Sequence, residues 1–260
     1  MFSFLTAPGE STPFILTNKH VVKNAKEVKL SISTSSPGDH TTRTGVAEIN
    51  LTEGWQDLWL PHPNPGIDLG GIAFGPLIDL MTRSGHQGYG VMFSESDILS
   101  QSELENLSSV EDILLIGYPN NFYDRLHNQP ITRQGITASD PKLPFNGKDE
   151  FMIDCSVFPG SSGSPIVLKE KYFTQNHNNQ LTMERRRTAL LGVLWGGPQH
   201  TVHGEVIPQP IPTVTQTQSK HLMNLGYAIS ACKIIDLKAQ IPKLPKYIQS
   251  KIHMNFIPAK

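Results

Sequence analysis

The 260-residue sequence contains only two cysteines, Cys155 and Cys232, which is too few for a disulfide framework. Both cysteines lie in apolar, strand-like surroundings, so we expect them to be buried free thiols. No apolar run is long enough to span a membrane. The first residues lack the charged region and the long apolar region of a signal peptide. We therefore expect a protein that does not bind membranes and is cytoplasmic.

Charge is also scarce, since charged residues make up 17% of the chain and the formal net charge is -1. A chain this close to neutral lacks the basic surface that binds nucleic acid or anionic lipid, so we expect neither as a partner. Glycine and proline are plentiful, at 21 and 20 residues, whereas hydrophobic residues reach only 38%. This balance favours many short strands joined by turns over long helices.

Strand-forming runs alternate with turn clusters along the whole chain. In the first half we expect strands at 12–22, 27–33, 43–51, 67–74 and 113–117. In the second half we expect strands at 131–138, 151–155, 165–169, 189–195 and 225–230. Two such sets predict an all-β fold of two β-barrels. The boundaries are an N-terminal barrel over residues 1–119, a C-terminal barrel over 120–240 and a tail over 241–260.

Two polar insertions interrupt the second half. Residues 172–187 read as the tip of a hairpin. Residues 198–221 are rich in Gln, Thr and Pro without a clear period, which indicates a long mobile loop. This loop starts after the strand at 189–195 and ends before Gly226, both beside the expected cleft. Its role as a lid, an exosite or an inert insertion therefore stays open. A regulatory protein partner is left open as well.

The most informative segment is Phe158-Pro159-Gly160-Ser161-Ser162-Gly163-Ser164-Pro165. It places serines in a glycine-flanked turn directly before an apolar run. A serine hydroxyl becomes a good nucleophile when a base removes its proton and nearby N–H groups bind the charge that develops. We assign Ser162 as the nucleophile and the N–H groups of Gly160 and Ser162 as an oxyanion hole.

The base and the acid are expected far upstream. His20 follows an apolar strand in Leu16-Thr17-Asn18-Lys19-His20, which would place its imidazole at a strand end facing a cleft. Asp68 opens the apolar run after a turn and would orient that imidazole. Asp57 is a rival acid, although its Trp-rich surroundings indicate a packed loop. His62, between two prolines, is interpreted as a loop constraint.

Other reactive residues fit less well. His200 and His203 could suggest a metal pair, but no further ligand stands at matching spacing, so we expect no metal ion and no cofactor. Cys155 lacks the glycine-rich turn that surrounds Ser162. The order His, Asp, Ser differs from the Ser, acid, His order of the α/β-hydrolases.

On these segments the chain resembles the trypsin-like (chymotrypsin-fold) serine peptidases, and in texture the Do-like high-temperature-requirement proteases and the glutamyl endopeptidases. Family patterns are met by residues 16–22, 68–72 and 159–165, with further matches out to about residue 232. The resemblance implies two perpendicular six-stranded antiparallel barrels with the active site at their junction. It also implies a serine endopeptidase with a His20, Asp68 and Ser162 triad and an acyl-enzyme intermediate.

The chain departs from these families at several positions. Zymogen-type relatives carry aspartate where this chain has Ser161, so activation by N-terminal cleavage is not expected. Little chain precedes the His20 strand, so the first barrel would lack or borrow its opening strand, and no regulatory PDZ domain is expected after residue 240.

Glutamyl endopeptidases carry histidine at the position of Leu194, and the matching pocket floor is the neutral Ser156. The residues expected to bind substrate are Ser156, Val157, Leu194, Trp195, Gly196 and Gly226, and they favour an uncharged P1 side chain.

The expected partner is therefore a protein or peptide substrate, which would pair with the strand at 189–195. Two alternatives stay open. One is a catalytically silent trypsin-like module that uses the cleft as a peptide groove, and the other is an acyl hydrolase that acts on esters.

Overall fold

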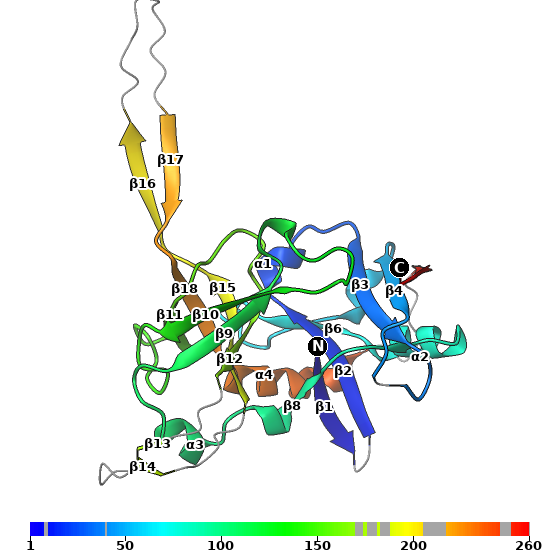
Figure 1. The fold of residues 1–260 in the computed structure, drawn as a ribbon, viewed down its shortest axis with the longest axis horizontal. Coiled ribbons are helices and arrows are strands. Elements are labelled where there is room, and N and C mark those ends of the chain that lie inside the picture. Colours follow the sequence, from blue (N-terminus) through cyan, green and yellow to red (C-terminus); the bar gives the residue numbers. More distant parts are fainter. Residues whose placement is uncertain are drawn as a thin grey trace, which may run out of the picture.

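The computed structural model describes residues 1–7, 10–39, 41–169, 174–175, 181–182, 188–204, 217–244 and 251–259. Their regular structure consists mainly of short strands, which form one closed barrel, two larger open sheets and two small hairpins (Figure 1). No described helix is long and apolar enough to cross a membrane.

The second half of the chain forms a closed antiparallel barrel with the strand order β10-β11-β18-β15-β12-β9. The six strands are β9 (Asp112–Gly117), β10 (Ile131–Thr137), β11 (Glu150–Asp154), β12 (Pro165–Leu168), β15 (Ala189–Gly196) and β18 (Leu225–Ser230). Side chains of a strand point alternately to its two faces, so every second residue can enter the barrel. On β9 these residues are Ile113 and Leu115, both fully buried.

The first half of the chain forms two open sheets. One has the order β5-β6-β2-β1-β8 and comprises β1 (Phe2–Ala7), β2 (Glu10–Thr17), β5 (Trp59–Pro61), β6 (Gly70–Ala73) and β8 (Phe93–Ser94). The other has the order β19-β4-β3-β7 and comprises β3 (Val28–Ser35), β4 (Gly45–Leu51), β7 (Gln87–Gly88) and β19 (Ile252–Pro258).

Short helices connect these strands. They are α1 (Lys19–Val22), η1 (Trp55–Leu58), α2 (Gly75–Arg83), η2 (Glu95–Asp97), α3 (Gln101–Glu105), η3 (Pro119–Asn121), α4 (Cys232–Ile235) and η4 (Asp236–Lys243).

The prediction of a six-stranded barrel in both halves is therefore met by the second half, while in the described residues the first half is not a closed barrel. A strand has only two hydrogen-bonding edges. Those of β4 are occupied by β3 and β19, and those of β6 by β2 and β5. Neither β4 nor β6 has a free edge, so these two strands cannot pair with each other to close a barrel. The chain end supplies one of these strands, since β19 pairs with β4 along its whole length.

Strand β15 lies at the interface between the two halves and contributes residues to both cores. All residues from Ala189 to Leu194 are buried, as expected for a strand covered on both faces. Leu191 and Leu194 point into the barrel core, whereas Leu190 and Val193 belong to the core cluster that contains the aromatic residues of the first half. The two halves therefore pack on each other through one continuous apolar interface, beside which the candidate site lies.

Several local expectations differ from the structure. The strand expected at 12–22 ends at Thr17, and the chain continues as the helix α1. Strands β1, β5, β7 and β8 and the helix α2 were not expected. Cys155 is buried as predicted, but Cys232 is exposed at the start of α4, so the prediction that both thiols are buried is wrong.

Each polar insertion contains a pair of strands. In the first, β13 (Thr174–Gln175) pairs with β14 (Leu181–Thr182). In the second, β16 (Gln199–Gly204) pairs in full register with β17 (Thr217–Leu222), and this hairpin extends away from the body of the molecule (Figure 1). The expectation of an irregular loop is wrong for these two strands. The expected lid or exosite also involves residues 205–216, which lie outside the described residues.

Candidate active site

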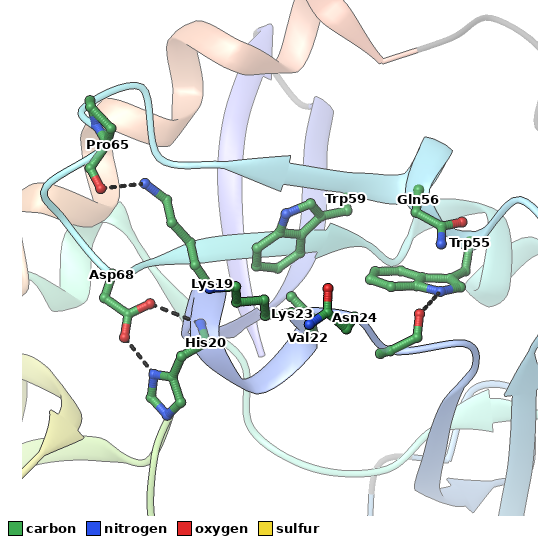
Figure 2. Close-up of a pocket in the computed structure, with 11 residues that line it drawn as sticks. Lys19, His20, Val22, Lys23, Asn24, Trp55, Gln56, Trp59, Pro65 and Asp68 are labelled. Carbon is green, nitrogen blue, oxygen red and sulfur yellow. Dashed lines mark hydrogen bonds and ion pairs between the residues drawn. The ribbon is translucent and has the colours of Figure 1, made fainter.

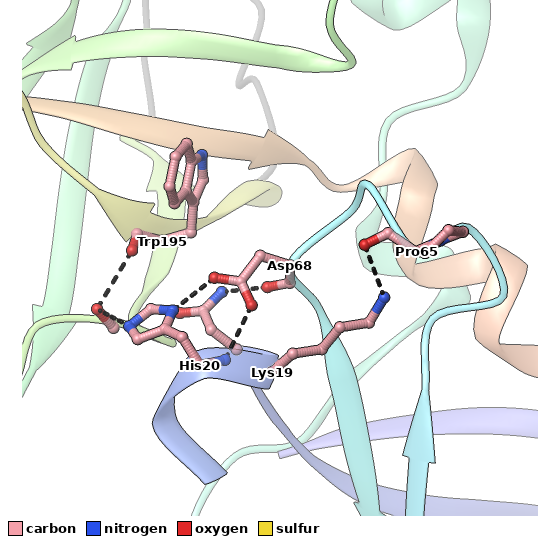
Figure 3. Close-up of polar contacts among 7 residues, drawn as sticks. Lys19, His20, Pro65, Asp68 and Trp195 are labelled. Atoms are coloured by element: carbon pink, nitrogen blue, oxygen red, sulfur yellow. Dashed lines mark hydrogen bonds and ion pairs between the residues drawn. The ribbon is translucent and has the colours of Figure 1, made fainter. Parts of the chain in front are cut away.

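Three side chains from distant parts of the sequence meet where the two halves adjoin. His20 lies on α1 after β2, Asp68 lies just before β6, and Ser162 lies in the turn before β12. His20 Nδ1 is 2.5 Å from Asp68 Oδ2, and His20 Nε2 is 3.1 Å from Ser162 Oγ. Figure 3 shows the imidazole of His20 next to the carboxylate of Asp68. Hydrogen bonds therefore connect the three residues singled out from the sequence, from Asp68 to His20 and from His20 to Ser162.

The contact with Asp68 determines which imidazole nitrogen carries the proton. A carboxylate only accepts hydrogen bonds, so the hydrogen on the short contact belongs to His20 Nδ1. In the neutral imidazole this leaves the lone pair of Nε2 directed at Ser162 Oγ. The side chain of His20 is 47% exposed and that of Asp68 is 26% exposed, so the imidazole is open to a substrate while the carboxylate is sheltered.

A second residue holds the Asp68 segment in place. Asn18 is completely buried, and its Nδ2 donates to the backbone carbonyl of Asp68 over 2.7 Å. Removing the amide would leave that carbonyl without this partner in a buried position, where a lost hydrogen bond is costly. Asn18 was not assigned a role from the sequence, although it stands two residues before His20.

The backbone shape of the turn around Ser162 depends on two glycines. Gly160 and Gly163 have φ angles of +82° and +84°, which a residue with a side chain rarely adopts. A Cβ on Gly160 would lie 3.2 Å from both the Asn120 nitrogen and the Tyr118 oxygen. Within the described part of the chain, no hydrogen bond uses the N–H of Gly160 or of Ser162. Both groups are thus available to an external acceptor.

Strand β15 passes directly beside this turn. Ser162 Oγ is 3.3 Å from the carbonyl oxygen of Trp195, and the N–H of Gly163 donates to the carbonyl of Leu194 over 2.8 Å. The pairing of β12 with β15 begins at Pro165 and Val193. The β15 edge beyond Leu194 is therefore not covered by β12. Trp195 is half-buried, and its ring stacks on Tyr227 with centroids 5.7 Å apart.

The expected specificity residues divide into two groups. Val157, Leu194 and Gly226 lie together, because a Cβ on Gly226 would be 2.7 Å from Leu194 Cδ1 and 3.0 Å from Val157 Cγ2. Leu194 has no exposed surface, so it does not present a contact surface to a substrate as expected. It faces the barrel interior and instead limits the depth of any depression above Gly226.

Gly196 has open space at the Cβ position, and Ser156 is exposed. The backbone carbonyl of Ser156 accepts a hydrogen bond from Arg133 Nη1. Arg133 was not identified from the sequence, because a basic residue in an amphipathic strand gives no signal of its role.

The rival histidine and acid lie elsewhere. His62 is 3% exposed; its Nδ1 accepts from the N–H of Asn64, which leaves Nε2–H to donate to the carbonyl of Lys233 over 3.1 Å. This arrangement agrees with its interpretation as a loop constraint. Asp57 lies in η1, and no described hydrogen bond or ion pair joins it to His20.

A cavity of about 560 Å³ adjoins the imidazole on the side of α1 and η1. Figure 2 shows Lys19, Lys23, Trp55 and Trp59 on its walls together with His20 and Asp68. Lys19 Nζ donates to the carbonyl of Asn64 over 2.9 Å. Burial lowers the pKa of Lys19, and the nearby Asp68 raises it in part. The cavity thus offers an aromatic wall and positive charge next to the candidate site.

Within the described residues, no group of three or more His, Cys, Asp and Glu side chains could hold a metal ion. His200 and His203 lie on β16, whose side chains are outside the described residues. The pKa of the Cys155 thiol is raised by burial, which disfavours the reactive thiolate.

Comparisons with known proteins agree with this geometry. The model of the trypsin-like peptidase domain matches residues 3–173, a range that includes His20, Asp68 and Ser162. No curated protein matches the chain.

Proposed function

The chain belongs to the trypsin-like peptidase domain family, and we propose that it is a serine endopeptidase in which His20, Asp68 and Ser162 form the catalytic triad. One observation carries this proposal. The lone pair of His20 Nε2 is directed at Ser162 Oγ over 3.1 Å, while Asp68 fixes the opposite side of the ring. A nucleophile, its base and the group that orients the base are the parts that peptide-bond hydrolysis at a serine requires.

The acylation step follows from this arrangement. Ser162 Oγ attacks the carbonyl carbon of the scissile bond, and its proton passes to His20 Nε2. The negative charge that forms on the carbonyl oxygen is bound by the N–H groups of Gly160 and Ser162. His20 then gives the proton to the leaving amine, and the C–N bond breaks to leave an acyl group on Ser162. Asp68 stabilises the imidazolium that exists between these two transfers.

Deacylation repeats the sequence with water in place of serine. His20 takes a proton from the water as it attacks the acyl carbon, and the same two N–H groups bind the second tetrahedral intermediate. When that intermediate collapses, His20 returns the proton to Ser162 Oγ. The half-exposed side chain of His20 gives this water access to the ring.

An extended peptide substrate suits the surface beside the triad. The uncovered edge of β15 after Leu194 can pair with a substrate backbone as an added strand. The buried side chains of Val157 and Leu194 limit the depth available at Gly226, which favours a small or medium uncharged P1 residue. A charged P1 side chain would be desolvated there without a described partner, which is unfavourable.

The alternative of a catalytically silent peptide-binding module gains no support from the site. Such a module would not depend on the contact between His20 and Ser162 or on two unoccupied N–H groups in the turn. Nothing in the geometry favours it over the enzyme.

The experiment is a digestion of a diverse peptide mixture by the purified protein, with new termini identified by mass spectrometry. The proposal predicts cleavage after uncharged residues, and predicts that Ser162→Ala abolishes it while the fold is retained. A wild-type protein that is folded and produces no new termini over a wide pH range would contradict the proposal.

A further inference from the structure

The turn that carries Ser162 is connected to the neighbouring strand β10 by one side chain. Arg133 Nη1 donates to the backbone carbonyl of Ser156, and Arg133 Nη2 donates to Ser161 Oγ over 3.0 Å. The guanidinium also lies 5.7 Å from the ring centroid of Phe158. One group thus contacts three residues of the segment 156–161, which leads directly to the nucleophile.

The strand geometry explains why Arg133 reaches this turn. Pairing between β10 and β11 is limited to Ile136 with Asp154 and Thr137 with Ile153. Gly135 lets the two chains approach closely, since a Cβ there would lie 2.3 Å from the Asp154 oxygen. Residues two apart on a strand share a face, so Arg133 projects on the same side as Gly135. Its side chain therefore spans the gap where the backbone of the 156–161 segment has left the sheet.

The backbone bonds of the turn connect it to β15, through Gly163 N–H and the Leu194 carbonyl, and to η3, through Asn120 N–H and the Pro159 carbonyl, but not to β10. Ser161 N–H donates to the carbonyl of Phe158, and Ser164 N–H donates to the carbonyl of Ser161. These two turns share Ser161, whose side chain is fully buried. They close the backbone locally but do not tie it to β10. The two hydrogen bonds from Arg133 supply that connection.

The positively charged guanidinium of Arg133 is used in this contact with the turn. No described carboxylate lies within ion-pair distance of its guanidinium, so its described acceptors are the carbonyl of Ser156 and the hydroxyl of Ser161. Burial lowers the pKa of Arg133, in keeping with a sheltered position. Hydrogen bonds from a charged donor are roughly twice as strong as those between neutral groups.

We infer that Arg133 is a positioning residue that holds the turn 156–162 in the shape in which the N–H groups of Gly160 and Ser162 point outward together. The inference about catalysis rests on the proposed function, whereas the inference about the turn does not. Arg133 acts through the backbone of the turn and does not touch the substrate.

The test compares Arg133→Met with a matched control, Arg125→Met. Arg125 also lies over an aromatic ring, that of Tyr123 at 5.9 Å, but it is exposed and donates no described hydrogen bond to the turn. The first readout is hydrogen–deuterium exchange of the peptide that spans residues 156–164. Exchange there should be faster in Arg133→Met than in the wild type, and unchanged in Arg125→Met.

The second readout is catalysis. Losing an oxyanion-hole donor costs about 10²–10³ in kcat, so a displaced turn should lower kcat by about 10–100-fold with KM changed only a few-fold. In Arg133→Ala, added methylguanidinium should restore part of the lost kcat, whereas Arg133→Lys should recover it only partly because an ammonium lacks the planar fork that reaches both acceptors. A role in stability alone would lower the melting temperature without these kinetic effects.

If Arg133→Met does not fold, Ser161→Ala removes one of the two contacts and should show the same changes on a smaller scale. Unchanged exchange over 156–164 in a folded Arg133→Met protein, or an unchanged kcat, would overturn the inference. An inactive wild type would contradict the proposed function instead, and the exchange measurement would still decide whether Arg133 holds the turn.

Discussion

Asp68 binds His20 through both of its carboxylate oxygens. Oδ1 accepts from the backbone N–H of His20 over 3.0 Å, and Oδ2 lies 2.5 Å from the ring nitrogen Nδ1. The first bond fixes where the residue lies, and the second fixes how the ring is rotated and which nitrogen is protonated. Because Asn18 holds the Asp68 backbone in turn, the imidazole orientation depends both on the junction of β2 with α1 and on the segment before β6.

The first prediction concerns this double contact. In Asp68→Asn, the amide oxygen can still accept from the backbone N–H of His20. Its NH₂ group would then face Nδ1 and move the ring proton to Nε2, where it opposes Ser162. We expect kcat to fall by about 10⁴ with little change in KM. Asp57→Asn is the control and should retain activity. Equal losses in the two variants would contradict the assignment of Asp68.

The second prediction is that Ser162 and His20 act as a unit. Ser162→Ala should lower kcat by about 10⁶, His20→Ala by a similar factor, and the double variant by little more. The control is His127→Ala, since His127 Nδ1 also lies close to a carboxylate, 2.7 Å from Asp124 Oδ2, but has no described serine partner. Steady-state kinetics on a peptide substrate give all four values. Losses that multiply in the double variant would show that the two residues work independently.

The three residues of the candidate site were easier to single out from the sequence than the strands of the first half. The three residues of the site each lie next to a glycine-rich or apolar segment, and local chemistry marks them without knowledge of the tertiary structure. The closed barrel of the second half was also predictable, because its strands are separated by clear turns. The first half was not, since the two-residue strands β7 and β8 carry almost no periodic signal.

The third prediction tests the backbone of the oxyanion hole. Gly160→Ala would place a Cβ 3.2 Å from backbone atoms of residues 118 and 120 at a φ of +82°. We expect the turn to shift and kcat to fall by up to about 10²–10³. Gly147→Ala has a similar φ of +77° with nothing within 4 Å, so it should show only the strain, about 1–2 kcal/mol of unfolding free energy. Equal kcat in the two folded variants would argue against the assigned oxyanion hole.

The fourth prediction concerns the specificity pocket. Leu194→Ala should open space beside Gly226 and shift cleavage toward larger uncharged P1 residues. Leu191→Ala removes another buried leucine from the same strand and should leave the P1 preference unchanged. Both variants should lose about 2–5 kcal/mol of stability. Profiling on a peptide library separates them, and a wild-type preference for Glu, Asp, Lys or Arg at P1 would rule out the pocket as described.

The fifth prediction is the direction of the pH dependence. Only a neutral His20 can accept the proton of Ser162, so kcat/KM should rise with pH as the imidazole loses its proton. The measurement is kcat/KM for an uncharged peptide over the range in which the fold is retained. A rate that falls as the pH rises would mean that the protonated form is the active one, contrary to the proposed mechanism.

The sequence could not reveal residues whose contacts are with distant parts of the chain. Arg133 and Asn18 are ordinary polar residues in the sequence, and the roles proposed for them come from the backbone carbonyls that the fold brings to them. The strand β19 is a similar case. Ile252, Met254 and Phe256 alternate with polar residues, but the sequence does not show that this short run pairs with β4 along its whole length.

The central claim is that Ser162 is an activated nucleophile, and covalent labelling tests it most directly. The folded protein is treated with an organophosphonate probe that reacts with activated serines, and the modified residue is located by mass spectrometry. The proposed mechanism predicts one adduct per chain on Ser162, with labelling lost in His20→Ala and retained in His127→Ala. A folded protein that remains unlabelled, or is labelled at a serine other than Ser162, would contradict it.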